Sequence, residues 1–442
     1  MKSTRGDQID ASESKIGIRR LLAGGSWAVI EQAFFACGSF AIHVILARLL
    51  AARDYGLFAV GYAVLLFVRT IYESIVTEPM TVFGPGRFAL MWARYLRVIF
   101  FKLYAPLMAS FVAICLSVAC ILWWLGIPNV PALVGGLAIA APCWLSFITV
   151  RRALYVVQRI QMSALLSGFY GIAVGLGLLG VSARMAMTPA LGFVVIALAS
   201  AVVGVTGLAA LGVVAASGGT ADDRLIQDVY EQHRKYGAWA FSAGLLRWLP
   251  ENMSVVLLPI THGVDAVAAF RASLNFILPA LQACSALRSY MTPTFVKQRL
   301  RGHLQTAIGG ALRLAVVLGA LYFVILLLSQ EYLFDWVYGG RYAEGREMLW
   351  VLGLMVLPAA GVTVFTSGFQ SVERPDLVFR AYAIATAIGG LAIGVLTFAQ
   401  GVFGSVLGTV LCQWLIFGAM AGKLFVLRTN DSGAITLNLR WQ

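Results

Sequence analysis

Charged residues are scarce in this chain. They make up only 12% of the 442 residues, and just 20 residues are Asp or Glu. A soluble domain usually contains about 25% charged residues, so this composition excludes an ordinary soluble fold. Hydrophobic residues take their place and account for 60% of the chain.

Motifs for nucleotide hydrolysis are absent as well. The sequence has no G-x-x-x-x-G-K-[ST] loop, which would hold the phosphates of ATP. The longest polar stretch between apolar runs, Ser217 to Tyr236, is too short for a nucleotide-binding or catalytic domain. We therefore expect that the chain is not an enzyme, has no catalytic residues and uses no cofactor.

The cysteines exclude two further kinds of site. All six lie in apolar runs, with neither the paired spacing of a metal site nor the framework of a small disulfide-bonded protein. We interpret them as small packing residues and predict no metal site.

Long apolar runs are what the sequence has in abundance. A hydrocarbon core of about 30 Å is crossed by about 20 helical residues, and the runs lack the period-two alternation of barrel strands. Hydropathy predicts spans near residues 21–47, 55–78, 96–125, 129–150, 162–181, 187–215, 236–260, 264–291, 307–329, 347–369, 377–399 and 402–426. The fold class is thus an all-α polytopic membrane protein with about twelve transmembrane helices.

A polar break near the middle divides these spans into two sets of six. We predict a cytoplasmic tail at residues 1–20, a first six-helix bundle at 21–216, a linker at 217–235, a second six-helix bundle at 236–426 and a tail at 427–442. An even number of crossings would give both bundles the same orientation, as in a parallel repeat.

Basic residues report topology rather than a nucleic-acid partner. The net charge is +13, but the 33 Lys and Arg cluster in alternate loops between the predicted spans. Such loops are cytoplasmic in membrane proteins. The pattern predicts a multi-pass protein with both termini in the cytoplasm and no binding to nucleic acid.

A few ionisable residues lie deep in the apolar runs. Arg69 with Glu73 and Arg247 with Glu251 have the i, i+4 spacing that brings two side chains to one helix face. An arginine at the centre of a membrane helix costs about 2.5–3.5 kcal/mol, so each needs a partner or water. A structural ion pair and a direct role in binding remain equal alternatives.

The span 264–291 carries a polar stripe. At about 100° per residue, Arg271, Asn275 and Gln282 fall within about 40° of one line along a straight helix. We expect this face to line a water-filled cavity, with hydrogen bonding between helices as the alternative.

The deep charges are predominantly basic. Five arginines (69, 247, 271, 288 and 313) outnumber three glutamates (31, 73 and 251). Such an interior favours an anion such as a phosphate or diphosphate. The candidate substrate-binding residues are Arg69, Arg247, Arg271, Asn275 and Gln282.

Coupling to a cation would need a buried carboxylate or a titratable group. The candidate ion-coupling residues are Glu31, Glu73, Glu251 and His43. Glu31 has no partner at helical spacing, and His43 could titrate near neutral pH, although a lone histidine is more often structural.

Three segments resemble one family of exporters. LARLLAARDYGLFA, from Leu46 to Ala59, resembles the signature region of the Wzx-type polysaccharide flippases of the MOP exporter superfamily. VYGGRYAEGREMLWVLG (337–353) and GFQSVERPDLVFRA (368–381) resemble patterns in the second half of that family.

The resemblance implies a MATE-like fold and a function. The expected cargo is a polyprenyl-pyrophosphate-linked oligosaccharide, which would be moved by alternating access across the bacterial inner membrane for surface polysaccharide synthesis. The partners would be this cargo, membrane lipid and the polysaccharide polymerase machinery.

Other functions are ranked below this one. A MATE-like cation-coupled multidrug antiporter is the main alternative, because Glu31 and Glu73 could serve as its carboxylates. Lipid II flippases usually carry two additional helices, for which this chain lacks room. A membrane glycan polymerase or ligase is disfavoured because the predicted outer loops are short.

Overall fold

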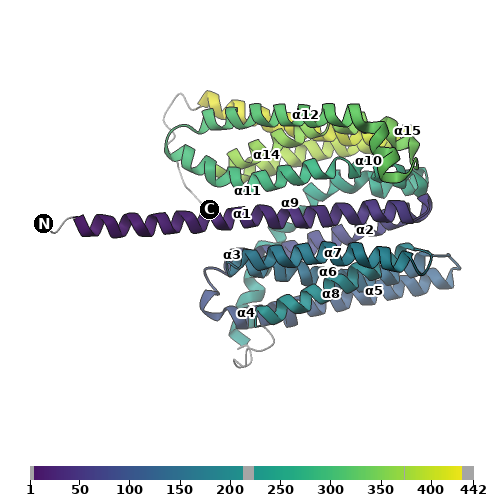
Figure 1. Ribbon diagram of the computed structural model, residues 1–442, viewed down its shortest axis with the longest axis horizontal. Helices are drawn as coiled ribbons and strands as arrows, with labels where there is room; N and C mark the ends of the chain where they lie inside the picture. Colours follow the sequence, from purple (N-terminus) through teal and green to yellow (C-terminus); the bar gives the residue numbers. More distant parts are fainter. Residues whose placement is uncertain (1–3, 213–222, 373, 431–442) are drawn as a thin grey trace. The chain divides into compact units, whose positions relative to one another are not determined.

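The computed structural model describes residues 4–212, 223–372 and 374–430, and nearly all of them are helical (Figure 1). Contacts divide the chain into two units. The first unit reaches Leu245 and includes Val337–Gly339; the second takes Leu246–Trp336 and everything from Gly340 onward. This division falls inside a helix, after the predicted linker at 217–235.

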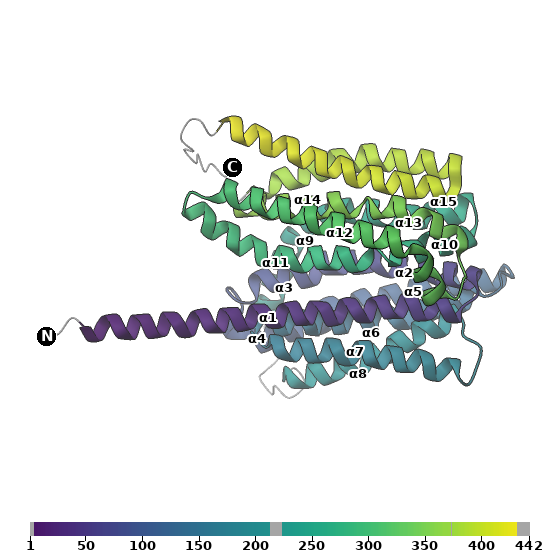
Figure 2. The ribbon, with the colours of Figure 1, turned by 45° about the horizontal axis from the view of Figure 1, so that its top comes forward.

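The described part of the first unit contains six helical rods and the first half of a seventh helix (Figure 2). The rods are α1 (Thr4–Leu49); α2 (Ala52–Tyr72) with η1 (Glu73–Thr77) and α3 (Glu78–Phe83); η2 (Ala89–Met91), α4 (Trp92–Val98) and η3 (Ile99–Tyr104) with α5 (Ala105–Trp124); α6 (Val130–Val156); α7 (Ile160–Ser182); and α8 (Pro189–Ala210). The half-helix is the part of α9 (Asp223–Thr261) that precedes Leu246.

The second unit begins with the remainder of α9. Its other elements are α10 (Val264–Asn275), α11 (Leu278–Leu300), α12 (Leu304–Tyr338), α13 (Ala343–Gly353), α14 (Val356–Ser371) and α15 (Pro375–Asn430). Its core is apolar and includes Phe365, Phe369, Ile393 and Ile416.

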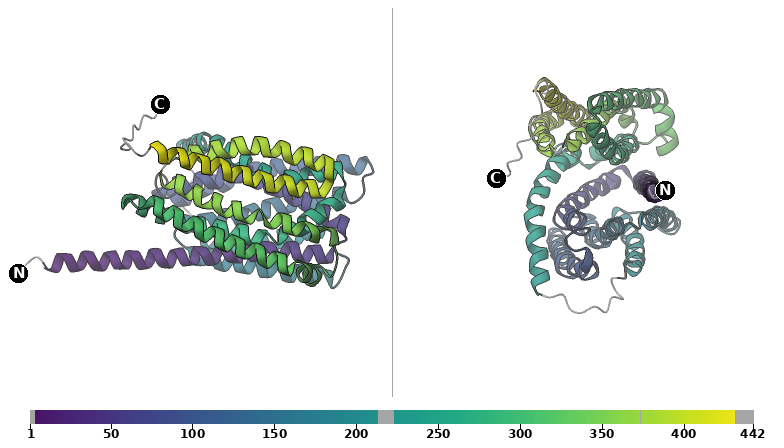
Figure 3. Two further views of the ribbon diagram at one scale, coloured as in Figure 1. Left: turned by 90° about the horizontal axis from the view of Figure 1, so that it is seen from above. Right: turned by 90° about the vertical axis from the view of Figure 1, so that its left-hand side faces the viewer.

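The long helix α15 is two antiparallel arms. Gly401 interrupts it with φ 59° and ψ −130°, a conformation that favours glycine. Gly389 then faces Cys412 and Gly408 faces Ile393, as expected when the chain turns back on itself (Figure 3). A hydrogen bond of 2.7 Å between the hydroxyls of Thr397 and Ser405 joins the arms next to the turn.

The described residues contain nine helices that are long and apolar enough to cross a membrane, and the bent pair α10–α11 makes a tenth. One of the nine, Asp376–Gly422, includes the turn at Gly401 and so covers two of the predicted spans. The predicted span 236–260 lies in α9, where Arg247, Glu251 and Asn252 lower the hydropathy. The observed fold is an all-α polytopic membrane protein, as the composition predicts.

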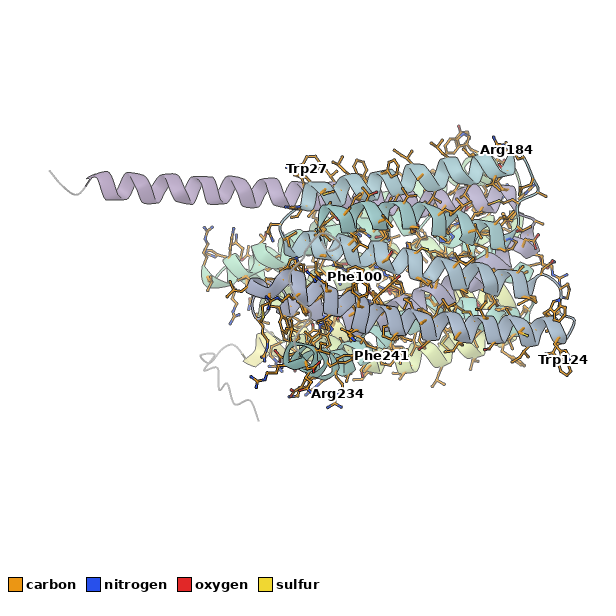
Figure 4. The ribbon with its side chains drawn as sticks, turned by 90° about the horizontal axis from the view of Figure 1, so that it is seen from below. Trp27, Phe100, Trp124, Arg184, Arg234 and Phe241 are labelled. Carbon is orange, nitrogen blue, oxygen red and sulfur yellow. The ribbon has the colours of Figure 1, made fainter. Side chains whose placement is uncertain are left out.

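Aromatic and basic side chains mark the ends of the first unit. Trp123 and Trp124, at the end of α5, are 74% and 80% exposed. Figure 4 places Trp124 and Arg184 at one end of this unit and Trp27 toward the other. Tryptophan favours the boundary between hydrocarbon and water, so these residues bracket the membrane-embedded part.

The span predicted at 264–291 is not one straight helix. Its two halves, α10 and the start of α11, meet at 50°. Pro279 lies in the first turn of α11 and has no N–H to continue the helix. The hydroxyl of Tyr322 donates to the carbonyl of Phe276 at the break, over 2.6 Å. The polar stripe calculated for a straight helix is therefore wrong beyond Asn275.

Glycine allows α1 and α7 to approach closely. A Cβ atom built on Gly38 would lie 2.9 Å from the Cα of Gly171, which real contacts do not tolerate. Small residues commonly permit such close packing of membrane helices. Gly38 and Gly171 therefore have a packing role between α1 and α7.

A π-helical turn between α2 and α3 contacts the first half of α9. η1 interrupts the regular α-helical hydrogen bonding at Glu73–Thr77. The carbonyl of Ile75 in this turn accepts a hydrogen bond from Nδ1 of His233 over 2.8 Å. Nε2 of the same ring lies 2.9 Å from the hydroxyl of Tyr95, which then acts as the donor. His233 is 1% exposed, and this burial lowers its pKa to about 4.

We expect Gly171→Leu to destabilise the protein because the larger side chain forces α1 away from α7. Gly180→Leu is the matched control on the same helix, since nothing lies within 4 Å of a Cβ there. Melting temperatures of both purified variants test this. Equal melting temperatures would contradict the close-packing interpretation.

His233 should make stability fall at acid pH. The unfolded chain protonates this histidine near its ordinary pKa of about 6.5, whereas the folded protein resists protonation down to about pH 4. The contribution of His233 to the free energy of unfolding is therefore fully present above about pH 6.5. This free energy falls by about 3 kcal/mol as the pH approaches 4.

Denaturation curves measured across this pH range test the expectation. His233→Gln should flatten the decline, whereas His303→Gln, at an exposed position, should leave the parent profile in place. An unchanged slope in His233→Gln would show that other groups cause the decline.

Candidate functional site

A buried carboxylate lies within the first unit. Glu31 on α1 is 1% exposed, and its oxygens accept hydrogen bonds from three side chains on α6 and α7. Arg151 Nε donates over 2.7 Å, Tyr155 over 2.9 Å and Ser167 over 2.7 Å. A second guanidinium nitrogen of Arg151 also contacts Glu31. The carboxylate is therefore paired with a cation and supplied with donors on both oxygens.

Aromatic rings complete the surroundings of Arg151. Its guanidinium carbon lies 3.8 Å from the centre of the Phe35 ring and 5.5 Å from that of Phe147. A guanidinium is weakly hydrated and stacks well on aromatic faces, which suits a buried position. We call Glu31, Arg151, Tyr155 and Ser167 the Glu31 cluster.

Sequence reasoning missed Arg151. It counted this residue with the basic loop after the span 129–150, because a hydropathy plot ends a span at a charge. The structure instead continues α6 to Val156, which places Arg151 inside the helix and leaves it only 9% exposed. The signal was Glu31 itself: a deep carboxylate without a partner at helical spacing implies a cation on another helix.

The predicted ion pair of Arg69 and Glu73 is present. Arg69 Nε lies 3.0 Å from a Glu73 oxygen, and the arginine is 5.5 Å from the centre of the Trp144 ring. Arg69 is also near enough to Arg151 for the two charges to interact. Two arginines and two glutamates thus balance inside this unit, so the predicted basic surplus is not found among its deep residues.

His43 is packed among aromatic rings. It is 1% exposed and meets the rings of Tyr62 and Phe58 edge-on, with centres 4.6 and 5.8 Å away. The Tyr62 hydroxyl lies 3.4 Å from that of Ser39. The histidine is thus held inside the bundle, away from open solvent.

In the second unit, Arg271 and Asn275 lie on α10 and are 4% and 0% exposed. Gln282 lies on α11, beyond the bend, and is half-buried. The break thus separates Gln282 from the other two candidates, and only Arg271 and Asn275 share a helix.

Arg247 and Glu251 lie on α9, and both are exposed on the surface of the second unit. Together with Arg288 they act electrostatically on Tyr382 of α15. Of the five charges that the sequence placed deep in this unit, only Arg271 is buried. Arg288 is half-buried, and Arg247, Glu251 and Arg313 are exposed, so their predicted depth is wrong.

Among the described residues, no three His, Cys, Asp or Glu side chains gather closely enough to hold a metal ion. The available chemistry is that of ion pairs, hydrogen-bond donors and aromatic faces. Such groups can bind and release a charged cargo.

No protein-family model matches the sequence, and no curated protein matches it either. Solved structures do match in fold. A multidrug resistance MATE family transporter of the MOP superfamily, in its inward-facing conformation, gives a TM-score of 0.73 at 11% identity; the match covers 92% of this chain and 100% of that one.

Two further structures belong to transporters of other types. The lipid II flippase MurJ, in an inward closed conformation, gives a TM-score of 0.68 at 10% identity, covering 90% of this chain and 87% of its own. A MOP superfamily transporter from Pyrococcus furiosus, described as having a binding pocket of reversed polarity, gives 0.65 at 11% identity, covering 93% and 95%. The chain has the MATE-like fold of MOP superfamily transporters.

Removing one partner of the Glu31 cluster should be costly. Arg151→Ala leaves a buried carboxylate without its cation, and we expect a loss of about 3–5 kcal/mol in the free energy of unfolding. The double variant Glu31→Met/Arg151→Met should recover most of this loss, because it leaves no uncompensated charge. Chemical denaturation of the purified protein measures both.

The control is the exposed pair of Glu231 and Lys235, whose nitrogen and oxygen lie 2.6 Å apart. Lys235→Ala should leave stability unchanged, because solvent screens that pair. A double variant in the Glu31 cluster that is no better than Arg151→Ala alone would overturn the electrostatic explanation.

Proposed function

We propose that this chain is a flippase that moves a polyprenyl-pyrophosphate-linked oligosaccharide across the bacterial inner membrane. It would act by alternating access, with both termini in the cytoplasm, during the synthesis of a surface polysaccharide. Its partners would be membrane lipid and the polymerase machinery that consumes the exported units. The fold is shared with transporters and flippases, and we propose no enzymatic activity.

The observation that carries this proposal is that both deep carboxylates in the first unit are paired with arginines. Glu31 is bonded to Arg151, and Glu73 is bonded to Arg69. A carboxylate that couples transport to a cation must bind and release that cation. Here each carboxylate already holds a tethered guanidinium, which an external ion would have to displace.

The charge of the second unit supports an anionic cargo. Arg271 is buried on α10, and in the predicted spans of this unit four arginines (247, 271, 288 and 313) outnumber one glutamate (251). Arginine donates several hydrogen bonds in a planar fork that matches phosphate oxygens. We propose that Arg247 and Arg271 contact the diphosphate, and that Asn275 and Gln282 bind sugar hydroxyls.

A MATE-like multidrug antiporter is the second candidate. The TM-score of 0.73 to a multidrug MATE transporter favours it. In that case the candidate ion-coupling residues are Glu31, Glu73, Glu251 and His43, and a cation would have to displace the arginines bonded to Glu31 and Glu73. The two candidates differ in the charge of the cargo.

Deleting the gene in its host separates the candidates. We expect a complete polyprenyl-pyrophosphate oligosaccharide to accumulate on the cytoplasmic side while the surface glycan disappears, as measured by lipid extraction and mass spectrometry. Sensitivity to cationic drugs without any accumulated lipid would instead establish the antiporter.

Complementation of the deletion tests the arginines. Arg271→Ala should abolish export at normal membrane abundance, because a buried cation that faces the diphosphate is lost. Arg313→Ala is the control, since Arg313 is exposed on α12 and should snorkel to the membrane boundary. Normal export by Arg271→Ala would remove this residue from the binding site.

A further inference from the structure

Two prolines follow the π-helical turns that the structure describes in the first unit. Pro79 lies in the first turn of α3, directly after η1, and Pro106 lies in the first turn of α5, directly after η3. A π-helical turn departs from regular α-helical bonding and is a common site of helix kinks. Each turn with its proline therefore forms a hinge in its rod.

Each proline removes the donor from one backbone carbonyl. In an α-helix the carbonyl of residue i−4 accepts from the N–H of residue i, which proline lacks, and the proline ring crowds that carbonyl. The affected carbonyl is that of Ile75 for Pro79 and that of Lys102 for Pro106. Ile75 lies in η1 and Lys102 lies in η3. Because an unsatisfied carbonyl is costly in an apolar region, each needs another donor.

The first half of α9 supplies a donor to both carbonyls. Nδ1 of His233 donates to the carbonyl of Ile75 over 2.8 Å, and the hydroxyl of Tyr230 donates to the carbonyl of Lys102 over 2.5 Å. Tyr230 and His233 are three residues apart, so they are neighbours on one side of the helix. One side of α9 thus bonds both hinges.

A glycine brings α9 against the backbone of η1. A Cβ atom built on Gly237, one turn after His233, would lie 3.2 Å from the Cα atom of Ile75 and 3.2 Å from the carbonyl oxygen of Ser74. A larger residue at this position would push α9 and η1 apart. We call Tyr230, His233 and Gly237 the α9 clamp.

The two hinges lie side by side. The ring of Tyr72, directly before η1, meets that of Tyr104, the last residue of η3, edge-on with 5.9 Å between the centres. The two turns also contact each other. This proximity allows one short stretch of α9 to reach both hinges.

α9 also holds the segment between the hinges, which runs from α3 to α4. The ring of Phe83, at the end of α3, meets that of Tyr236 on α9 edge-on at 6.0 Å. Arg87, between α3 and η2, donates to both carboxylate oxygens of Asp228 on α9, over 3.0 and 2.7 Å. Tyr95 attaches α4 through its hydroxyl. The segment is thus bonded to α9 at several points along its length.

We propose that the α9 clamp couples the two proline hinges, so that α3 and α4 change their angles to α2 and α5 together. While Tyr230 and His233 donate, both hinges keep the angles of this structure. When α9 moves away, both carbonyls lose their donors at once, and the two rods become free to bend. The device is a conformational switch of the first unit and works with any cargo.

Hydrogen exchange of the full-length protein in lipid nanodiscs, read by mass spectrometry, tests the coupling. Tyr230→Phe removes one hydroxyl from a side chain that is 45% exposed, so the fold should be retained. Exchange should become about two- to tenfold faster, as for the loss of one hydrogen bond, in peptides covering both 73–80 and 99–105. Tyr332→Phe, at an exposed position of α12, is the matched control and should exchange like the parent.

Faster exchange at 99–105 alone would overturn the proposal, because each hinge would then respond only to its own hydrogen bond. Unchanged exchange at both hinges would overturn it as well. The measurement uses no cargo, so neither result depends on the proposed flippase function. Coupled hinges in a protein that exports no glycan would count against that function alone.

Restoring a missing N–H tests the role of the prolines. Pro106→Ala supplies a donor for the carbonyl of Lys102 within its own helix. In this background Tyr230→Phe should no longer accelerate exchange at either hinge, because the carbonyl does not depend on α9. The same acceleration with and without Pro106→Ala would contradict the proposed origin of the clamp.

Moving α9 away from η1 should act in the same direction. Gly237→Ala places a methyl group against the backbone of Ile75, and we expect faster exchange at both hinges although alanine favours a helix. Gly180→Ala is the matched control, since nothing lies within 4 Å of a Cβ atom there. An acceleration confined to η1 would show that α9 does not couple the hinges.

Discussion

A carboxylate inside a membrane bundle stays ionised only when a cation and hydrogen-bond donors surround it. Glu31 meets this requirement with side chains of α6 and α7, so one charge ties three helices of the first unit together. The position of α1, the length of α6 and the placement of Phe35 against Arg151 are all consistent with this single constraint.

The same constraint distributes charge unevenly along the chain. The first unit neutralises its deep glutamates with Arg69 and Arg151, whereas the second retains more arginines than glutamates. The fold occurs in transporters of different kinds, since one structural neighbour is a multidrug transporter and another is a lipid II flippase. Charge, rather than fold, is therefore the property on which the proposed cargo depends.

Glycine has three different uses in this protein. Gly171 allows two helices to approach, Gly401 allows α15 to turn back, and Gly394 faces the flexible end of Met253. In the sequence, the spacing of Gly390 and Gly394 resembles that of Gly171 and Gly175, and all four suggest close packing. Only the partner that lies opposite each glycine distinguishes these uses.

Hydropathy is a local property, so the sequence by itself determined the helical class, most of the spans and the i, i+4 pair of Arg69 and Glu73. Sequence reasoning ended the fourth span before Arg151 and treated 264–291 as straight, because the compensating groups, Glu31 and Tyr322, are distant in the chain. Only the tertiary structure decided which charges are neutralised, where a helix breaks and which partner lies opposite each glycine. Each depends on contacts between residues that local sequence does not pair.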